Sequence, residues 1–71
     1  MNTGEINSDN VVVGYYGDEM TIVQREDGEL FYAPVSKGLY PIGTVVNDDE
    51  LFSITRLPYS IQSKIKKLVE E

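Results

Sequence analysis

The Asp27-Gly28 pair constrains the fold of this chain most strongly, because it separates two segments rich in strand-forming residues. EMTIVQR over residues 19–25 precedes the pair, and ELFYAPV over residues 29–35 follows it. Asp-Gly between two such segments is a strong hairpin signal, since both residues tolerate the positive φ of a type I′ turn. The sequence therefore predicts an antiparallel hairpin whose loop residues are Asp27 and Gly28.

The predicted hairpin register assigns side chains to its two faces. With this loop, Ile22 lies opposite Ala33 and Glu26 lies opposite Glu29. One face then carries Met20, Ile22, Phe31, Ala33 and Val35, and the other carries Thr21, Val23, Arg25, Leu30 and Tyr32. Because both faces are partly apolar, a small barrel is favoured over a flat sheet with one solvated side.

Further strands and one helix are predicted in the rest of the chain. The additional strands span about residues 10–16, 42–47 and 51–56, and Gly14 indicates a bulge in the first of them. The helix spans about residues 58–70, because its apolar side chains recur at the helical spacing i, i+4, i+7 and i+8, namely Ile61, Ile65, Leu68 and Val69.

These elements predict an α+β fold, a small antiparallel β-sheet or SH3-like partly open barrel of four to five strands with one C-terminal helix. Residues 1–9 are expected to form a flexible N-terminus, and residues 10–71 a single compact domain. A chain of 71 residues buries a small core, so self-association into a homodimer is expected to support it.

The composition argues against several kinds of site. The chain has no Cys and no His, which removes disulfides, thiolate nucleophiles and the common zinc sites. No catalytic signature accompanies its Ser-Lys neighbours, so we predict no enzymatic activity. NDDE over residues 47–50 lacks the ligand spacing of a calcium loop and is interpreted as a solvated turn. We therefore expect no metal and no cofactor.

Two further patterns concern the cell compartment. No apolar run approaches the roughly 18 residues of a membrane span. The first ten residues, MNTGEINSDN, contain neither the basic nor the apolar region of a signal peptide. A cytoplasmic protein without a membrane partner is the expectation.

Charge is the compositional feature that bears most on function. Twelve Asp and Glu face six Lys and Arg, and residues 1–50 alone carry a net charge of −8. Such a field repels nucleic acid and attracts basic partners. Eight acids in three clusters are the candidate partner-binding residues: Asp18, Glu19, Glu26, Asp27, Glu29, Asp48, Asp49 and Glu50. Each acid taken alone fits an ordinary solvated turn, and only their accumulation indicates an interaction surface.

The spacing of some of these acids suggests what they imitate. In an extended segment, side chains at i and i+2 lie on one face about 6.5–7 Å apart. Asp27 with Glu29, and Asp48 with Glu50, have that sequence spacing. DNA carries one phosphate per roughly 3.4 Å of axis on each strand. Rows of carboxylates on strands are thus expected to resemble rows of phosphates.

In size, acidity and the layout GDE, REDGE, NDDE, the chain resembles the small acidic DNA-mimic proteins of bacteriophages. The type in question inhibits the bacterial histone-like nucleoid protein HU. The resemblance implies a stoichiometric, dimeric inhibitor in the host cytoplasm that blocks the DNA site of a basic DNA-binding protein. The basic C-terminal helix departs from this pattern, so it would face away from the target or serve self-association.

Two other classes of function remain open. A small β-barrel adaptor would recognise a peptide or protein through exposed aromatic side chains, of which Tyr40 and Tyr59 are the best candidates. A structural or regulatory subunit would instead assemble through a free strand edge or through the apolar stripe of the helix, if Ile61, Ile65 and Leu68 are accessible.

Overall fold

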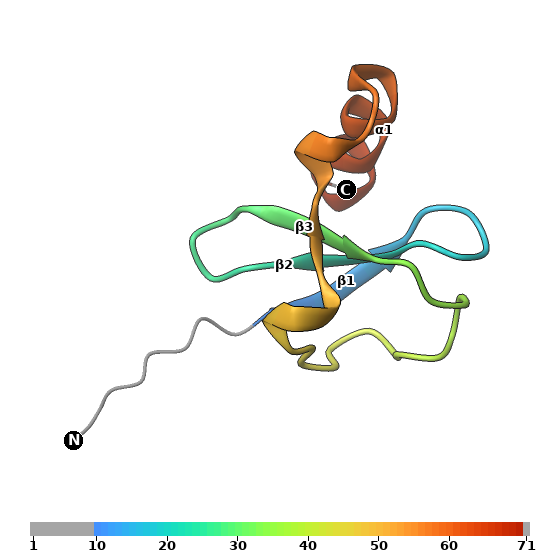
Figure 1. Cartoon of the computed structure of the whole chain (residues 1–71), viewed down its shortest axis with the longest axis vertical. Coiled ribbons are helices and arrows are strands. Elements are labelled where there is room, and N and C mark those ends of the chain that lie inside the picture. Colours follow the sequence, from blue (N-terminus) through green and yellow to red (C-terminus); the bar gives the residue numbers. More distant parts are fainter. Residues whose placement is uncertain (1–9, 71) are drawn as a thin grey trace.

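One antiparallel sheet organises residues 10–70, the part of the chain that this computed structural model describes (Figure 1). The expected flexible segment 1–9 lies outside the described residues. The strands are adjacent in chain order: β1 (Val11–Tyr15), β2 (Thr21–Gln24), β3 (Leu30–Ala33) and β4 (Phe52–Ser53). The helical elements are two short 3-10 helices and one α-helix: η1 (Asp48–Glu50), η2 (Ile54–Arg56) and α1 (Tyr59–Glu70). The predicted small α+β fold with an antiparallel sheet and a C-terminal helix is confirmed.

Both faces of the sheet are covered, which explains why β2 is apolar on both sides. Helix α1 lies on one face, and the segment between β3 and β4 lies below the other in Figure 1. The α1 side holds a buried cluster of Ile22, Leu30, Ile54 and Ile65. The opposite side holds a second cluster of Val12, Val23 and Val46. The fold is therefore a single open sheet between two thin layers, and no closed barrel forms in the described residues.

The register of the hairpin differs from the predicted one by one residue. Ile22 pairs with Tyr32, and Val23 pairs with Phe31, so the predicted pairing of Ile22 with Ala33 is wrong. A shift of one residue exchanges the faces of a strand. Leu30 and Tyr32 consequently lie toward α1 with Ile22, while Phe31 and Ala33 lie on the face of Val23.

The cause of this shift is a three-residue loop, 26–28, in place of the expected two-residue loop. Arg25 N–H donates to the Glu29 carbonyl at 2.8 Å, and Gly28 N–H donates to the Arg25 carbonyl at 2.8 Å. Gly28 adopts a φ of +95°, the left-handed conformation that ends a three-residue hairpin loop. The Asp27 carboxylate stabilises this turn by accepting from Glu29 N–H at 2.9 Å.

Two of the other predicted strands are shortened or absent. Residues 42–47 form only an isolated bridge, Val11 to Val45, because Gly43 turns the chain with a φ of +96°. The segment still hydrogen-bonds to the outer edge of β1, where Val12 N–H donates to the Thr44 carbonyl at 2.9 Å. The strand expected over 51–56 ends at Ser53, whose hydroxyl accepts from Thr55 N–H at 3.2 Å and starts η2.

The predicted apolar stripe of the helix packs against the sheet. Ile65 is fully buried, and Ile61 and Val69 pack against the same cluster. Leu68, the remaining residue of the stripe, is 36% exposed, so most but not all of the stripe belongs to the core. Gly14 lies at the expected bulge in β1, where a Cβ atom would stand 2.7 Å from Cδ2 of Leu68.

This close approach gives a stability prediction. Replacing Gly14 by Ala is expected to lower the free energy of unfolding by about 1 kcal/mol, because the new methyl group overpacks the contact with Leu68. In the Gly14→Ala/Leu68→Ala double variant the clash is absent, so the added cost of Gly14→Ala should vanish. Urea unfolding of the single and double variants measures this coupling. Additive losses would show that the two residues do not clash.

Candidate acidic interaction surface

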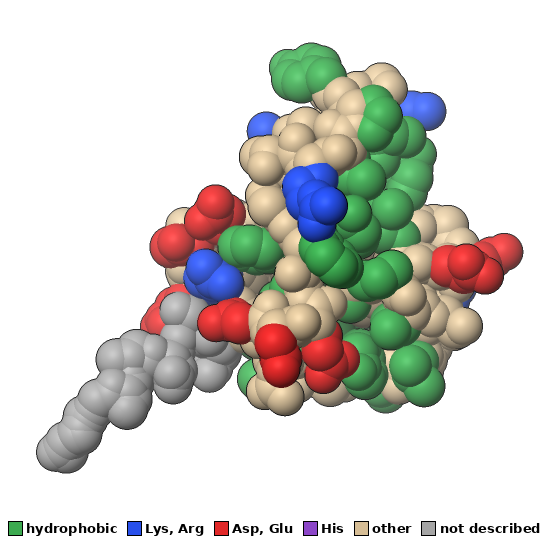
Figure 2. All heavy atoms as spheres, in the orientation of Figure 1, with side chains coloured by type: hydrophobic (Ala, Val, Ile, Leu, Met, Phe, Trp, Pro, Cys, Tyr) green, Lys and Arg blue, Asp and Glu red, His purple; other side chains and the backbone are tan. Residues whose placement is uncertain are grey.

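The eight candidate acids are all exposed, but they do not form one surface. Asp18 and Glu19 lie in the turn between β1 and β2, whereas residues 26–29 lie in the turn between β2 and β3. These turns are at opposite ends of β2, and Figure 2 shows acidic side chains on the left and on the right of the molecule. A four-residue strand is about 13 Å long, so the pair at 18–19 stands apart from the rest.

The other six acids form what we call the acidic end of the molecule: Glu26, Asp27, Glu29, Asp48, Asp49 and Glu50. An ion pair of 3.0 Å between Arg25 and Asp48 connects the β2–β3 turn to η1 and brings the two clusters together. These six carboxylates and the Arg25 guanidinium amount to a net charge of −5. Arg25 and Asp48 are 23 residues apart in sequence, so two distant segments contribute to one charged region.

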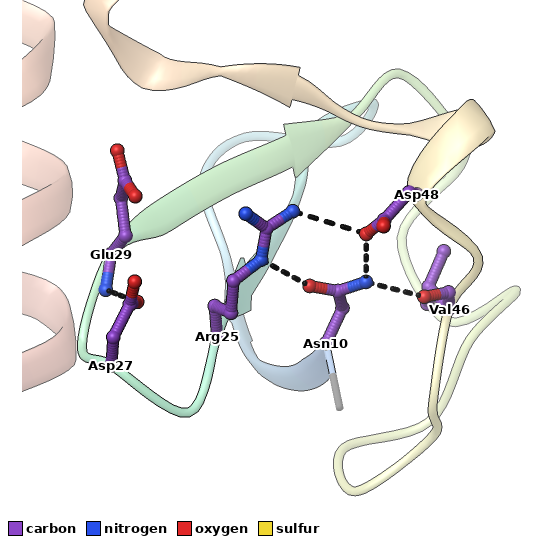
Figure 3. Close-up of polar contacts among 6 residues, drawn as sticks. All are labelled: Asn10, Arg25, Asp27, Glu29, Val46 and Asp48. Carbon is purple, nitrogen blue, oxygen red and sulfur yellow. Dashed lines mark hydrogen bonds and ion pairs between the residues drawn. The ribbon is translucent and has the colours of Figure 1, made fainter. Parts of the chain in front are cut away.

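A buried asparagine fixes this connection (Figure 3). Asn10 is only 3% exposed, and its Nδ2 donates to the Val46 carbonyl at 3.1 Å and to Asp48 Oδ1. Its Oδ1 accepts from Arg25 Nε at 3.1 Å. We call Asn10, Arg25 and Asp48 the Asn10 clamp. Sequence reasoning missed Asn10, because an Asn before a strand is ordinarily exposed and no local pattern signals its burial.

The arrangement of acids into extended rows is not found, so that prediction is wrong. Asp48 and Glu50 lie in the 3-10 helix η1, and Asp27 lies in the hairpin turn with its carboxylate folded back on Glu29 N–H. Neither pair therefore has the spacing of an extended strand. Asp27, Asp48 and Glu50 each stabilise local structure as well as carrying charge.

Tyr40 was expected to offer an exposed aromatic ring, but it anchors the segment between β3 and β4. Its hydroxyl donates to Glu50 Oε1 at 2.6 Å, and its carbonyl accepts from the Tyr15 hydroxyl at 2.6 Å. The ring packs against the cluster of Val12 and Val23. The hydrogen bond to Glu50 raises the pKa of Tyr40 above the ordinary value, and desolvation and the negative charge of Glu50 act in the same direction.

The raised pKa of Tyr40 predicts the pH range in which its hydrogen bond to Glu50 is lost. Because the folded-state pKa lies above the unfolded value of 10.0, the stabilisation is complete below pH 10 and disappears as pH rises through the folded-state pKa. The difference between ultraviolet titrations of the native chain and Tyr40→Phe should therefore have a midpoint above 10.0. A midpoint at or below that value would contradict the Tyr40–Glu50 bond in solution.

Several large apolar side chains are also exposed. Three of them occur in the segment between β3 and β4 and define the apolar loop patch: Leu39, Ile42 and Val45, which are 60%, 65% and 61% exposed. Tyr59, at the start of α1, is 78% exposed and keeps the accessibility that the sequence predicted for it.

Neither a metal centre nor a membrane span is found among residues 10–70. No group of three or more Asp and Glu is positioned there to hold a metal ion. In the same residues, no helix has the length and apolar character needed to cross a membrane. Comparisons of the chain with protein-family models, with curated proteins and with solved structures find no match.

Proposed function

We propose that this chain is an acidic DNA mimic, which binds a basic DNA-binding protein such as a bacterial nucleoid protein and blocks its DNA site. The observation that carries the proposal is the acidic end, where two distant segments present six exposed carboxylates around a single guanidinium. Glu26, Glu29 and Asp49 make no side-chain hydrogen bond or ion pair with other described residues, so they are free to meet Lys and Arg of a partner.

The distribution of charge supports a defined orientation on the target. Figure 2 shows most of the visible Lys and Arg side chains around α1, one among the acids on the left, and most Asp and Glu side chains around the sheet turns and η1. A molecule with this polarity turns its acidic end toward a basic groove as it approaches. The start of α1, with the exposed Tyr59, then faces away from the target, whereas its second half lies beside the acidic end, and the chain acts stoichiometrically without catalysis.

The test is capture of a partner from a bacterial lysate on the immobilised chain at low ionic strength. We expect an abundant basic DNA-binding protein to be retained, to elute early in a salt gradient and to be displaced by added duplex DNA. A matched column carries the Glu26→Gln/Glu29→Gln/Asp49→Asn variant, which should retain much less of it. Retention that duplex DNA does not displace would contradict the proposal. Light scattering of the purified chain checks the homodimer that we expect.

A second candidate is a protein-binding adaptor, which the apolar loop patch favours. Leu39, Ile42 and Val45 expose apolar area on a segment that lies outside the acidic end. Binding through this patch would barely change with ionic strength, whereas binding through the acidic end weakens steeply. The salt gradient in the same capture experiment therefore separates the two candidates.

A further inference from the structure

A groove next to the acidic end offers a more specific contact than surface charge alone. It has a volume of about 360 Å³ and lies between the second half of α1, the β2–β3 turn and residues 53–55. Apolar side chains from three different elements line it: Leu30, Ile54 and Val69. Leu30 and Ile54 are buried in the core, so this apolar lining is held rigidly.

The rim of the groove is rich in hydrogen-bond acceptors. Glu29 from the hairpin turn and Glu70 from the end of α1 contribute carboxylates from distant parts of the sequence. The amide nitrogens of both rim glutamines are already used: Gln62 Nε2 donates to the Leu57 carbonyl at 2.8 Å, and Gln24 Nε2 donates to the Gly28 carbonyl at 3.3 Å. Each glutamine keeps its side-chain oxygen as an acceptor, together with the second N–H of its amide group.

An apolar lining below a rim of acceptors suits an amphipathic cation. Arginine buries its methylene stem on apolar surface while its guanidinium donates up to five hydrogen bonds and accepts none. The planar guanidinium also pairs with carboxylate and amide oxygens in a fixed geometry. The negative end of the α1 dipole adds to the attraction for a cation at Glu70. Lys66 is the one cationic side chain among the groove residues, and it opposes this attraction.

We propose that the groove receives an arginine side chain of the basic partner. The methylenes lie on Leu30, Ile54 and Val69, and the guanidinium lies between Glu29 and Glu70. This inference rests on the proposed function, since it names the side chain by which a basic protein is held beside the acidic end. It makes the contact selective for arginine, where a charged surface alone would accept any cation.

The test uses N-acetyl-arginine amide as the probe and N-acetyl-citrulline amide as its uncharged isostere. In amide NMR spectra of the whole chain, the arginine probe should shift the backbone amide resonances of Leu30, Ile54 and Val69, and the shifts should saturate. The citrulline probe lacks the positive charge and should bind at least about fivefold more weakly, which corresponds to about 1 kcal/mol. Equal binding of both probes, or shifts confined to residues outside the groove, would overturn the inference.

Variants of the rim residues show whether each side chain strengthens or weakens arginine binding. Glu29→Gln/Glu70→Gln should weaken arginine binding at least about fivefold, whereas Lys66→Gln should strengthen it, because a like charge is removed. Asp18→Asn/Glu19→Gln makes the same charge change as the double Glu variant at the far turn and should leave the affinity within a factor of about two. All these positions are exposed, so the fold is expected to survive each change. Equal effects of the two double variants would contradict a groove contact.

The probe needs no partner protein, which separates failure of this inference from failure of the proposed function. If arginine occupies the groove but duplex DNA displaces nothing from the column, the DNA mimic fails and the arginine site stands. If DNA displaces a captured protein but the probe leaves Leu30, Ile54 and Val69 unshifted, the mimic stands and the groove contact is refuted.

Discussion

Replacing Asn10 by Ala is expected to lower the free energy of unfolding by about 2–4 kcal/mol, because it leaves buried polar partners without hydrogen bonds. The side chain of Asn10 bonds to the Val46 carbonyl, to Arg25 Nε and to Asp48 Oδ1. Its loss also leaves the exposed Arg25–Asp48 ion pair as the remaining side-chain link between the hairpin turn and η1 among the described residues. A domain of this size has little stability in reserve, so part of the population should be unfolded without denaturant.

Urea unfolding followed by circular dichroism measures this loss. Gln24→Ala is the matched control, because it removes an amide at the neighbouring hairpin that makes one exposed hydrogen bond of 3.3 Å. Its cost should stay below about 1 kcal/mol. Similar losses of unfolding free energy in the two variants would show that the hydrogen bonds of Asn10 contribute no more than one exposed hydrogen bond.

The second large effect is expected from charge reversal at the acidic end. Glu26→Lys/Asp49→Lys changes the net charge of that end from −5 to −1 without touching the Asn10 clamp or the Tyr40–Glu50 bond. We expect the affinity for the captured DNA-binding protein to fall by about 100-fold, which corresponds to about 2.7 kcal/mol. Asp48 and Glu50 are poorer choices for this test, because reversing either of them would also disrupt the structure.

Asp18→Lys/Glu19→Lys is the control for that reversal, since it makes an equal charge change at the opposite end of β2. The length of β2, about 13 Å, exceeds the Debye length of about 10 Å at 0.1 M ionic strength. At that ionic strength the control should lose affinity by only a few fold. Calorimetric titration of both variants measures their affinity for the partner. Equal losses of affinity would mean that the net charge of the chain, and not the acidic end, determines binding.

The local sequence pattern predicted the helix and the hairpin. It did not predict the register of the hairpin, because that register goes with the length of the loop between β2 and β3. The stripe of Ile61, Ile65 and Val69 packs as expected, because helical periodicity directly encodes a buried face. Asp27-Gly28 fits both a two-residue and a three-residue loop. The bond from Glu29 N–H to the Asp27 carboxylate accompanies the longer loop, which exchanged the faces of β3.

The candidate site was predicted as a set of residues but not as a surface. Exposure of the acids follows from their turn positions. Their division into two ends follows from the order of the strands, and the union of 26–29 with 48–50 depends on Asn10, whose burial is a tertiary property. The strand expected over 42–47 failed for a similar reason. Its apolar residues suit a strand, but two turns centred on Gly38 and Gly43 shape the segment around Tyr40.

For the binding that we propose, the Asn10 clamp has a consequence that does not depend on its charge. Because η1 is held against the hairpin before any partner arrives, the entropic cost of ordering the acidic end is met during folding and is not subtracted from the binding free energy. A chain with the same carboxylates on a loosened η1 would present the same net charge and bind more weakly. Preorganisation by one buried amide is thus what distinguishes this acidic end from a flexible acidic tail.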